Sequence, residues 1–231
     1  MKRLVFRWLS VLAIALSTSF STINAQGLGA SAGGEIVSSY IWRGQDLGGV
    51  SIQPTATVSL GDFSITAWGS IGLESYDTKE FDFTFGYAKN GFSAAITDYW
   101  FNTVNSYFDY DDESTAHMIE ATVGYDFGPA AVVFNTYFAG ADYYSKDSKK
   151  RSYSTYIEAS VPFVISDVNF KAEFGLTPWE GLYSDKFNVV NVGIKAGKEL
   201  KISDSFSLPV FTKISFNPNS EKCWFVFGIT L

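Results

Sequence analysis

The fold is decided by the stretch Lys222-Cys223-Trp224-Phe225-Val226-Phe227-Gly228-Ile229-Thr230-Leu231. Every second residue from Cys223 to Leu231 is apolar, whereas the alternate positions are mixed. Side chains of a β-strand point alternately to opposite faces, so this pattern predicts a strand with one apolar face. An apolar strand in this position is typical of outer-membrane barrels, in which the last strand closes against the first and faces lipid. We therefore expect a closed barrel.

The N-terminal segment has the pattern of a secretory signal peptide. Basic residues at positions 2, 3 and 7 precede an apolar run at positions 8–16. This run is shorter than the roughly 20 residues that a membrane-spanning helix needs. We expect cleavage after Ala25, which leaves residues 26–231 as a single barrel domain. Export by this route predicts a location in the cell outer membrane.

Composition narrows the class of protein further. Removal of Lys2, Arg3 and Arg7 with the leader leaves 14 basic residues against 24 acidic residues, a net charge of −10. Phosphates would be repelled by this charge, so we expect no nucleic-acid partner. The single cysteine, Cys223, excludes an intrachain disulfide. Aromatic residues make up 17% of the chain, and no apolar run beyond the leader has the length of a membrane-spanning helix.

Segments of about ten residues with alternating polarity recur along the rest of the chain. The expected strands cover residues 35–42, 51–60, 63–71, 80–88, 92–100, 117–125, 130–138, 152–161, 168–177, 189–198, 206–216 and 222–231. Twelve is an even number, as a single-chain bacterial barrel requires, and the connections are alternately long and short. The sequence thus predicts an all-β, transmembrane, up-and-down barrel of twelve antiparallel strands. The alternative is a secreted β-sandwich, whose strands are usually shorter.

Three local features refine this interpretation. Pro54 cannot donate to a ladder, so we expect a bulge or a local gap there. Asn90-Gly91 is a strong signal for a hairpin turn. Aromatic residues gather near the strand ends, where we expect two interfacial girdles. The outer girdle would hold Tyr40, Trp42, Tyr99, Trp100, Tyr137, Phe138 and Trp179, and the periplasmic girdle Phe63, Tyr87, Phe92, Tyr125, Phe163 and Phe206.

One segment near the start of the barrel carries a family resemblance. The residues are Val37-Ser38-Ser39-Tyr40-Ile41-Trp42-Arg43-Gly44, then Ile52-Gln53-Pro54, then Ala67-Trp68-Gly69-Ser70. An aromatic strand ending in Arg-Gly, a strand with Pro and a Trp-Gly-Ser step resemble the start of the TorF-type porin family of bacterial outer-membrane β-barrel proteins. The resemblance implies an outer-membrane barrel and assigns no catalytic residue.

Charged residues on the strands should face the interior of the barrel. On the lipid side, each would cost roughly 2–4 kcal/mol near the midplane. A twelve-stranded barrel is intermediate in size between the filled eight-stranded and the open sixteen-stranded forms. Its lumen could therefore be either a narrow hydrated pore or a space closed by ion pairs. Trp68, Tyr156 and Trp224, in the inward register, favour partial filling. The candidate lumen-facing residues are Glu35, Arg43, Glu80, Asp82, Glu120, Glu158, Lys171, Glu173, Lys195 and Lys213.

Two long connections carry clusters of charge at the expected outer rim. The acidic residues could bind Ca²⁺ through oxygen ligands, but the Gly that such a loop usually contains is missing, so a solvated loop is the simpler interpretation. The basic residues could contact lipid phosphates or simply solubilise a loop tip. These candidate rim residues are Asp109, Asp111, Asp112, Glu113, Lys149, Lys150 and Arg151.

Little in the chain points to catalysis. A membrane phospholipase would need a serine beside a histidine, and the only histidine, His117, lies in the apolar register, as expected for a girdle residue. We expect no enzyme, no cofactor and no metal. The predicted function is a passive pore for small hydrophilic solutes. The alternatives are a non-conducting scaffold or binding barrel and, third, a membrane-embedded hydrolase. Expected partners are outer-membrane lipid and, through the last strand, the barrel-assembly machinery.

Overall fold

The computed structural model describes residues 27–231 except positions 76, 78, 102–105, 112–113 and 145–146. The expected signal peptide, residues 1–25, and the rim residues Asp112 and Glu113 lie outside this part. The described residues form strands and turns only, and twelve of the strands close into an antiparallel barrel, so the predicted fold class is confirmed. Within these residues no helix is long and apolar enough to cross a membrane, a finding without bearing on crossing by strands.

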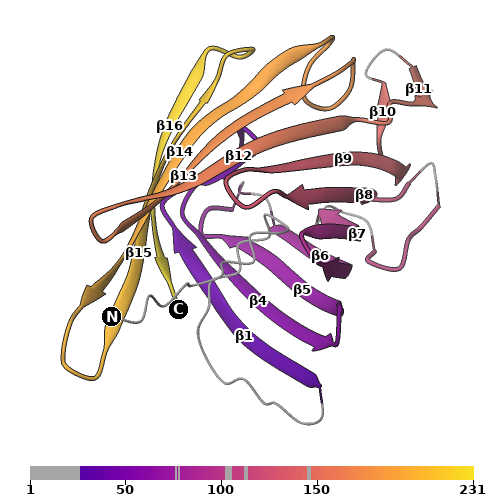
Figure 1. Cartoon of the computed structure of the whole chain (residues 1–231). Coiled ribbons are helices and arrows are strands. Elements are labelled where there is room, and N and C mark those ends of the chain that lie inside the picture. Colours follow the sequence, from indigo (N-terminus) through magenta and orange to yellow (C-terminus); the bar gives the residue numbers. More distant parts are fainter. Residues whose placement is uncertain (1–26, 76, 78, 102–105, 112–113, 145–146) are drawn as a thin grey trace.

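The barrel strands follow one another around the wall in chain order (Figure 1). They are β1 (Leu28–Val37), β4 (Ser51–Leu60), β5 (Phe63–Gly72), β6 (Lys79–Lys89), β7 (Phe92–Phe101), β8 (His117–Asp126), β9 (Ala131–Gly140), β12 (Thr155–Ile165), β13 (Val168–Thr177), β14 (Asn188–Lys201), β15 (Ser207–Asn217) and β16 (Lys222–Thr230). Two small hairpins stand between them, β2 (Tyr40–Trp42) with β3 (Gln45–Gly48) and β10 (Tyr143–Tyr144) with β11 (Asp147–Arg151).

The last strand closes the barrel against the first, as predicted. Glu35, Ile36 and Val37 of β1 pair with β16, and the backbone N–H of Ser38 donates to the carbonyl of Phe227 at 2.8 Å. Along its other edge β1 pairs with β4 from Leu28 to Val37. Where residues 35–37 pair with β16, the sheet has no free edge. Removal of free edges is the usual reason for closing a β-sheet into a barrel.

The first strand was predicted too late in the sequence. Residues 35–42 were expected to form it, but β1 begins at Leu28 and ends at Val37. Backbone hydrogen bonds to β4 hold this Gly- and Ala-rich stretch in the sheet. The stretch therefore forms a strand without alternating polar and apolar side chains. A bend at Ser38–Ser39 then turns the chain away from the wall, and Tyr40–Trp42 becomes β2.

Two local predictions are confirmed. The ladder between β4 and β5 has no pairs at Gln53 and Pro54, yet the pairs on either side stay in register, which is a gap and not a bulge. Asn90 and Gly91 have φ values of 51° and 85°, so both central residues of the turn between β6 and β7 are left-handed, as expected for a two-residue hairpin.

The outer face of the barrel is apolar and uncovered. Phe81, Phe83, Phe225 and Phe227 are 36%, 45%, 65% and 44% exposed, so no second sheet packs on them and the sandwich alternative is wrong. Most of the buried side chains are instead Ser, Thr, Asn, Asp and Glu. A soluble domain has its apolar residues inside, so this molecule has the reverse distribution.

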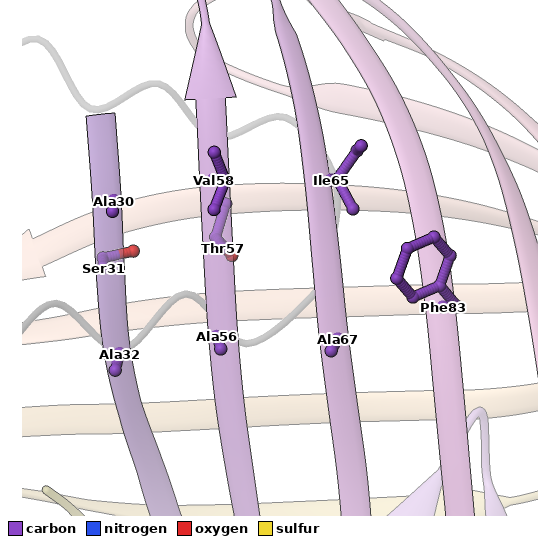
Figure 2. A pocket seen from close by; sticks show the side chains of 9 residues that line it. All are labelled: Ala30, Ser31, Ala32, Ala56, Thr57, Val58, Ile65, Ala67 and Phe83. Carbon is purple, nitrogen blue, oxygen red and sulfur yellow. The ribbon is translucent and has the colours of Figure 1, made fainter. Parts of the chain in front are cut away.

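The outer wall contains a shallow hollow of about 520 Å³ (Figure 2). Its floor is a cross-strand row of small side chains, Ala32 on β1, Ala56 on β4 and Ala67 on β5. Val58, Ile65 and Phe83 rise beside it. Because the hollow is lined mainly by apolar groups of the outer face, it lies on the opposite side of the wall from the charged lumen residues.

Candidate functional site

The β2–β3 hairpin folds inward across the lumen. Its turn is Arg43-Gly44, with φ values of 49° and 72°. A β-carbon on Gly44 would collide with the carbonyl oxygen of Val190 on β14, so the turn requires glycine both for its conformation and for this close approach. The carbonyl of Gly44 accepts a hydrogen bond from Asn217 Nδ2 at 2.8 Å, which fixes the tip against β15.

Arg43 at this tip reaches the far wall. Its guanidinium donates to both carboxylate oxygens of Glu120 on β8, at 2.6 and 2.8 Å, and to the hydroxyl of Tyr183 at 2.6 Å. Strand β8 is five strands around the ring from β1 in one direction and seven in the other. The hairpin therefore spans the lumen from one side to the other. Bidentate pairing of this kind is both stronger and more directional than a single ion-pair contact.

Aromatic side chains fill the space around this ion pair. The guanidinium carbon lies 4.1 Å from the ring centroid of Trp42 and 5.0 Å from that of Tyr156. Tyr99 donates to Glu120 at 3.0 Å. Tyr137 and Tyr156 are 0% and 2% exposed, so these two rings are shielded from solvent. We call the group the Arg43 plug, made of Arg43, Trp42, Tyr99, Glu120, Tyr137, Tyr156 and Tyr183.

The Arg43 plug contradicts part of the girdle prediction. Tyr40, Trp42, Tyr99 and Tyr137 were expected at the outer interface, but they lie inside the barrel. Tyr99 and Tyr137 follow the inward register of Thr97 and Asn135, so alternation within their strands would have placed them correctly. Tyr183 comes from the loop between β13 and β14, and strand alternation says nothing about a loop residue.

A row of three lysines lies along the inner wall on neighbouring strands. Lys171 on β13, Lys195 on β14 and Lys213 on β15 are direct cross-strand partners. Glu173 bridges Lys171 at 3.2 Å and Lys213 at 2.7 Å. Lys195 lies 3.7 Å from Glu35. Lys171 and Lys195 keep 32% and 33% of their side chains exposed, so solvent reaches this lysine row from inside the barrel.

Tyr156 connects the lysine row to the Arg43 plug. Its hydroxyl donates to Glu158 at 2.7 Å and accepts from Asn191 Nδ2 at 3.2 Å. Glu158 lies 3.4 Å from Lys171. One network of charges and hydroxyls therefore runs from the hairpin tip to the solvated part of the lumen.

Glu80 and Asp82 on β6 form an acidic pair of a different kind. Glu80 accepts a hydrogen bond from the hydroxyl of Tyr40 at 3.0 Å. Both carboxylates are more than nine-tenths buried, and Oδ1 of Asp82 has no hydrogen-bond partner among the described residues. Within that part of the chain, neither carboxylate lies within 4 Å of a lysine or arginine nitrogen, whereas every other lumen carboxylate predicted from the sequence does.

The structure thus brings the ten predicted lumen residues into the barrel, eight of them in ion pairs and two in the acidic pair. The eight are Glu35, Arg43, Glu120, Glu158, Lys171, Glu173, Lys195 and Lys213.

Asp77 holds the leg of the hairpin that returns to the wall. Its carboxylate accepts from the backbone N–H of Gly49 at 3.0 Å and from that of Glu74 at 2.9 Å. These two donors hold the pKa of Asp77 below its usual value, because they stabilise the ionised form. The hairpin is therefore fixed at its tip by Arg43 and at its base by Asp77.

His117 lies on the outside of the wall, as its register predicted, but it is fully buried there. Residues of the loop between β7 and β8 cover it: Nε2 lies 2.6 Å from the carbonyl of Tyr107, and Tyr110 stacks on the ring at 4.1 Å between centroids. Nδ1 lies 2.7 Å from Asp98. Both ring nitrogens thus contact an acceptor, and neither of these partners is a hydroxyl that could serve as a nucleophile.

The described rim residues make local contacts. Asp109 accepts from the backbone N–H of Asp111 at 3.1 Å, a local turn. Arg151 donates to the carbonyl of Gly140 at 2.6 Å, and Lys150 lies over the ring of Tyr144. The side chain of Lys149 is outside the described part of the chain. Within that part, no group of three or more His, Cys, Asp or Glu residues is placed to hold a metal ion.

No protein-family model matches the chain, and no curated protein matches its sequence. The function must therefore be argued from the barrel itself.

Proposed function

We propose that this chain crosses a bacterial outer membrane and provides a restricted passage for small hydrophilic solutes. The observation that carries the proposal is the reversed distribution of polarity: an apolar outer wall surrounds a charged interior in which Lys171 and Lys195 are one-third exposed. Such an outer wall suits lipid, and such a lumen suits water. Lipid of the outer membrane and the assembly machinery that reads the last strand are the proposed partners.

The Arg43 plug determines how much can pass. It spans the lumen, and Tyr137, Tyr156 and Tyr183 within it are buried. Passage therefore depends on displacement of the β2–β3 hairpin. Loops folded into the lumen restrict other barrels in the same physical way, because a barrel of this size leaves little space beside them.

The experiment is single-channel recording in a planar bilayer. The wild-type chain is compared with a variant in which residues 40–48 are replaced by a short Gly-Ser turn. We expect small or infrequent conductance steps from wild type and larger, persistent steps from the shortened variant. A silent shortened variant would contradict a passage.

The second candidate is a closed barrel that acts as a scaffold or binding protein at the cell surface. The bidentate Arg43–Glu120 pair favours it, because this pair seals the lumen with buried groups on both sides. A shortened variant that inserts and folds but never conducts would support this candidate.

We also propose that the barrel has no catalytic role. His117 has both ring nitrogens directed at Asp98 and the carbonyl of Tyr107. Hydrolysis of outer-membrane lipid by the purified protein, lost on His117→Ala, would contradict this.

A further inference from the structure

The charges of the ten lumen residues discussed above do not balance. Among them, four cationic side chains, Arg43 and the lysine row, are set against six carboxylates. The two carboxylates left over are Glu80 and Asp82, which are 6% and 7% exposed. Buried charges are normally paired with an opposite charge or coordinate a metal ion, because desolvation without compensation is costly. The deficit is therefore confined to one place on β6.

The surroundings of this acidic pair supply further groups that favour a cation. Ser70 is the cross-strand partner of Glu80 and is fully buried. Trp68 and Tyr99 flank Asp82 on the two neighbouring strands, in the same inward register. Tyr40 of the hairpin closes the site from the lumen side, with its hydroxyl on Glu80 and its ring 5.6 Å from that of Trp68. Hard oxygen ligands and aromatic faces both attract cations.

A bound cation and a shared proton neutralise different amounts of charge. A proton shared by Glu80 and Asp82 would remove one of the two charges and leave the other. A divalent cation would neutralise both carboxylates and could coordinate Oδ1 of Asp82, which has no hydrogen-bond partner among the described residues.

We propose that Glu80 and Asp82 form a binding site for a small divalent inorganic cation between β6 and the β2–β3 hairpin. Oxygen donors of this kind suit Ca²⁺ and, at lower coordination number, Mg²⁺. Because Tyr40 closes the site, a bound cation would also hold the base of the hairpin against the wall. A conducting and a non-conducting barrel would both possess this site, so it does not depend on solute passage.

The test is calorimetric titration of the full-length barrel, refolded in detergent and stripped with EDTA, with CaCl₂, MgCl₂, KCl and tetramethylammonium chloride. We expect saturable binding of one divalent ion at least tenfold tighter than K⁺, with a rise in the unfolding temperature. Absence of saturable binding by any of these ions, or binding of tetramethylammonium alone, would overturn the proposal.

Variants locate the binding. Asp82→Asn and Glu80→Gln keep the shape of each side chain and are expected to weaken binding at least tenfold. Asp62→Asn, in an exposed turn far from the lumen, should bind as wild type. Glu158→Gln removes an equal charge from the lumen and should weaken binding much less than Asp82→Asn. Equal losses in these two lumen variants would indicate diffuse electrostatics and overturn the site. Compact mobility in SDS gels before heating verifies folding, and if Asp82→Asn fails that check, Glu80→Gln decides the test.

Discussion

Arg43 and Glu120, 77 residues apart in the sequence, form a bidentate ion pair with N–O distances of 2.6 and 2.8 Å inside the barrel. Glu120 is 1% exposed and Arg43 11%. Arg43 is the charged residue of the two-residue turn at the hairpin tip. The pair therefore connects this tip to a strand on the far wall. Together with the contacts of Asn217 and Asp77, this pair holds the hairpin across the lumen.

Arg43→Ala should destabilise the barrel by about 3–5 kcal/mol, because it leaves the carboxylate of Glu120 buried without its partner. The double variant Arg43→Met with Glu120→Leu should recover most of this loss, since no charge is then stranded. Urea unfolding in lipid vesicles measures both. Arg43→Lys should fall between wild type and Arg43→Ala, because an ammonium cannot make the bidentate contact. Equal stability of Arg43→Ala and of the double variant would show that the ion pair does not hold the hairpin.

Gly44→Ala should displace the hairpin tip. The new β-carbon would meet the carbonyl of Val190 and would sit at a φ of 72°, so both a collision and backbone strain oppose it. Gly61→Ala is the matched control, because Gly61 also has a positive φ, 59°, but nothing within 4 Å of an added β-carbon. Gly61→Ala should lose only about 1–2 kcal/mol of folding stability, the cost of a left-handed backbone conformation. Equal losses in the two variants would mean that the tip has room to adjust, and larger conductance steps in Gly44→Ala alone would confirm displacement.

Asp77 should make the anchoring of the hairpin sensitive to acid. Its pKa in the folded protein lies below the unfolded value of about 3.9, because two backbone N–H groups stabilise the carboxylate. The stabilisation is therefore complete above that unfolded value and is lost as the pH falls through the lower folded value. The stabilities of wild type and Asp77→Asn in urea should differ at pH 7, begin to converge as the pH falls below about 4, and meet only below the folded pKa. A difference that stays constant down to pH 2.5 would contradict this role.

The wall of the barrel was readable from the sequence, because each strand must keep one face apolar over its length. Eleven of the twelve predicted strands overlap the observed ones closely. The exception, β1, is rich in Gly, Ala and Ser and is held by backbone pairing, which leaves no pattern in the side chains. Charged residues on the strands are expected inside because hydrocarbon disfavours charge on the outer face.

The hairpin and its contacts could not be read in the same way. A bend at Ser38–Ser39 interrupts the strand, so Tyr40 and Trp42 lie inside the barrel and not on the outer face that alternation predicted. No local signal in the sequence marks this bend. Aromatic residues near strand ends fit a girdle and a packed lumen equally well, and only register separates Tyr99 from its neighbour Trp100. The pairing of Arg43 with Glu120 is a tertiary contact that no spacing along the chain encodes.

The outer wall offers a direct test of the proposed membrane environment. Ile96 is the fifth residue of the ten-residue strand β7 and is 50% exposed on the outer face, whereas Ser64 on β5 is in the inward register. Ile96→Arg would place a charge against hydrocarbon near the middle of the wall and should cost about 2–4 kcal/mol, whereas Ser64→Arg places the same charge in the polar lumen and should cost less. Reversible urea titration of the barrel in lipid vesicles measures the difference. In water, an exposed Ile96→Arg would be nearly neutral, because surface substitutions usually change stability by less than about 0.5 kcal/mol. A neutral Ile96→Arg in vesicles would therefore mean that this face does not contact lipid.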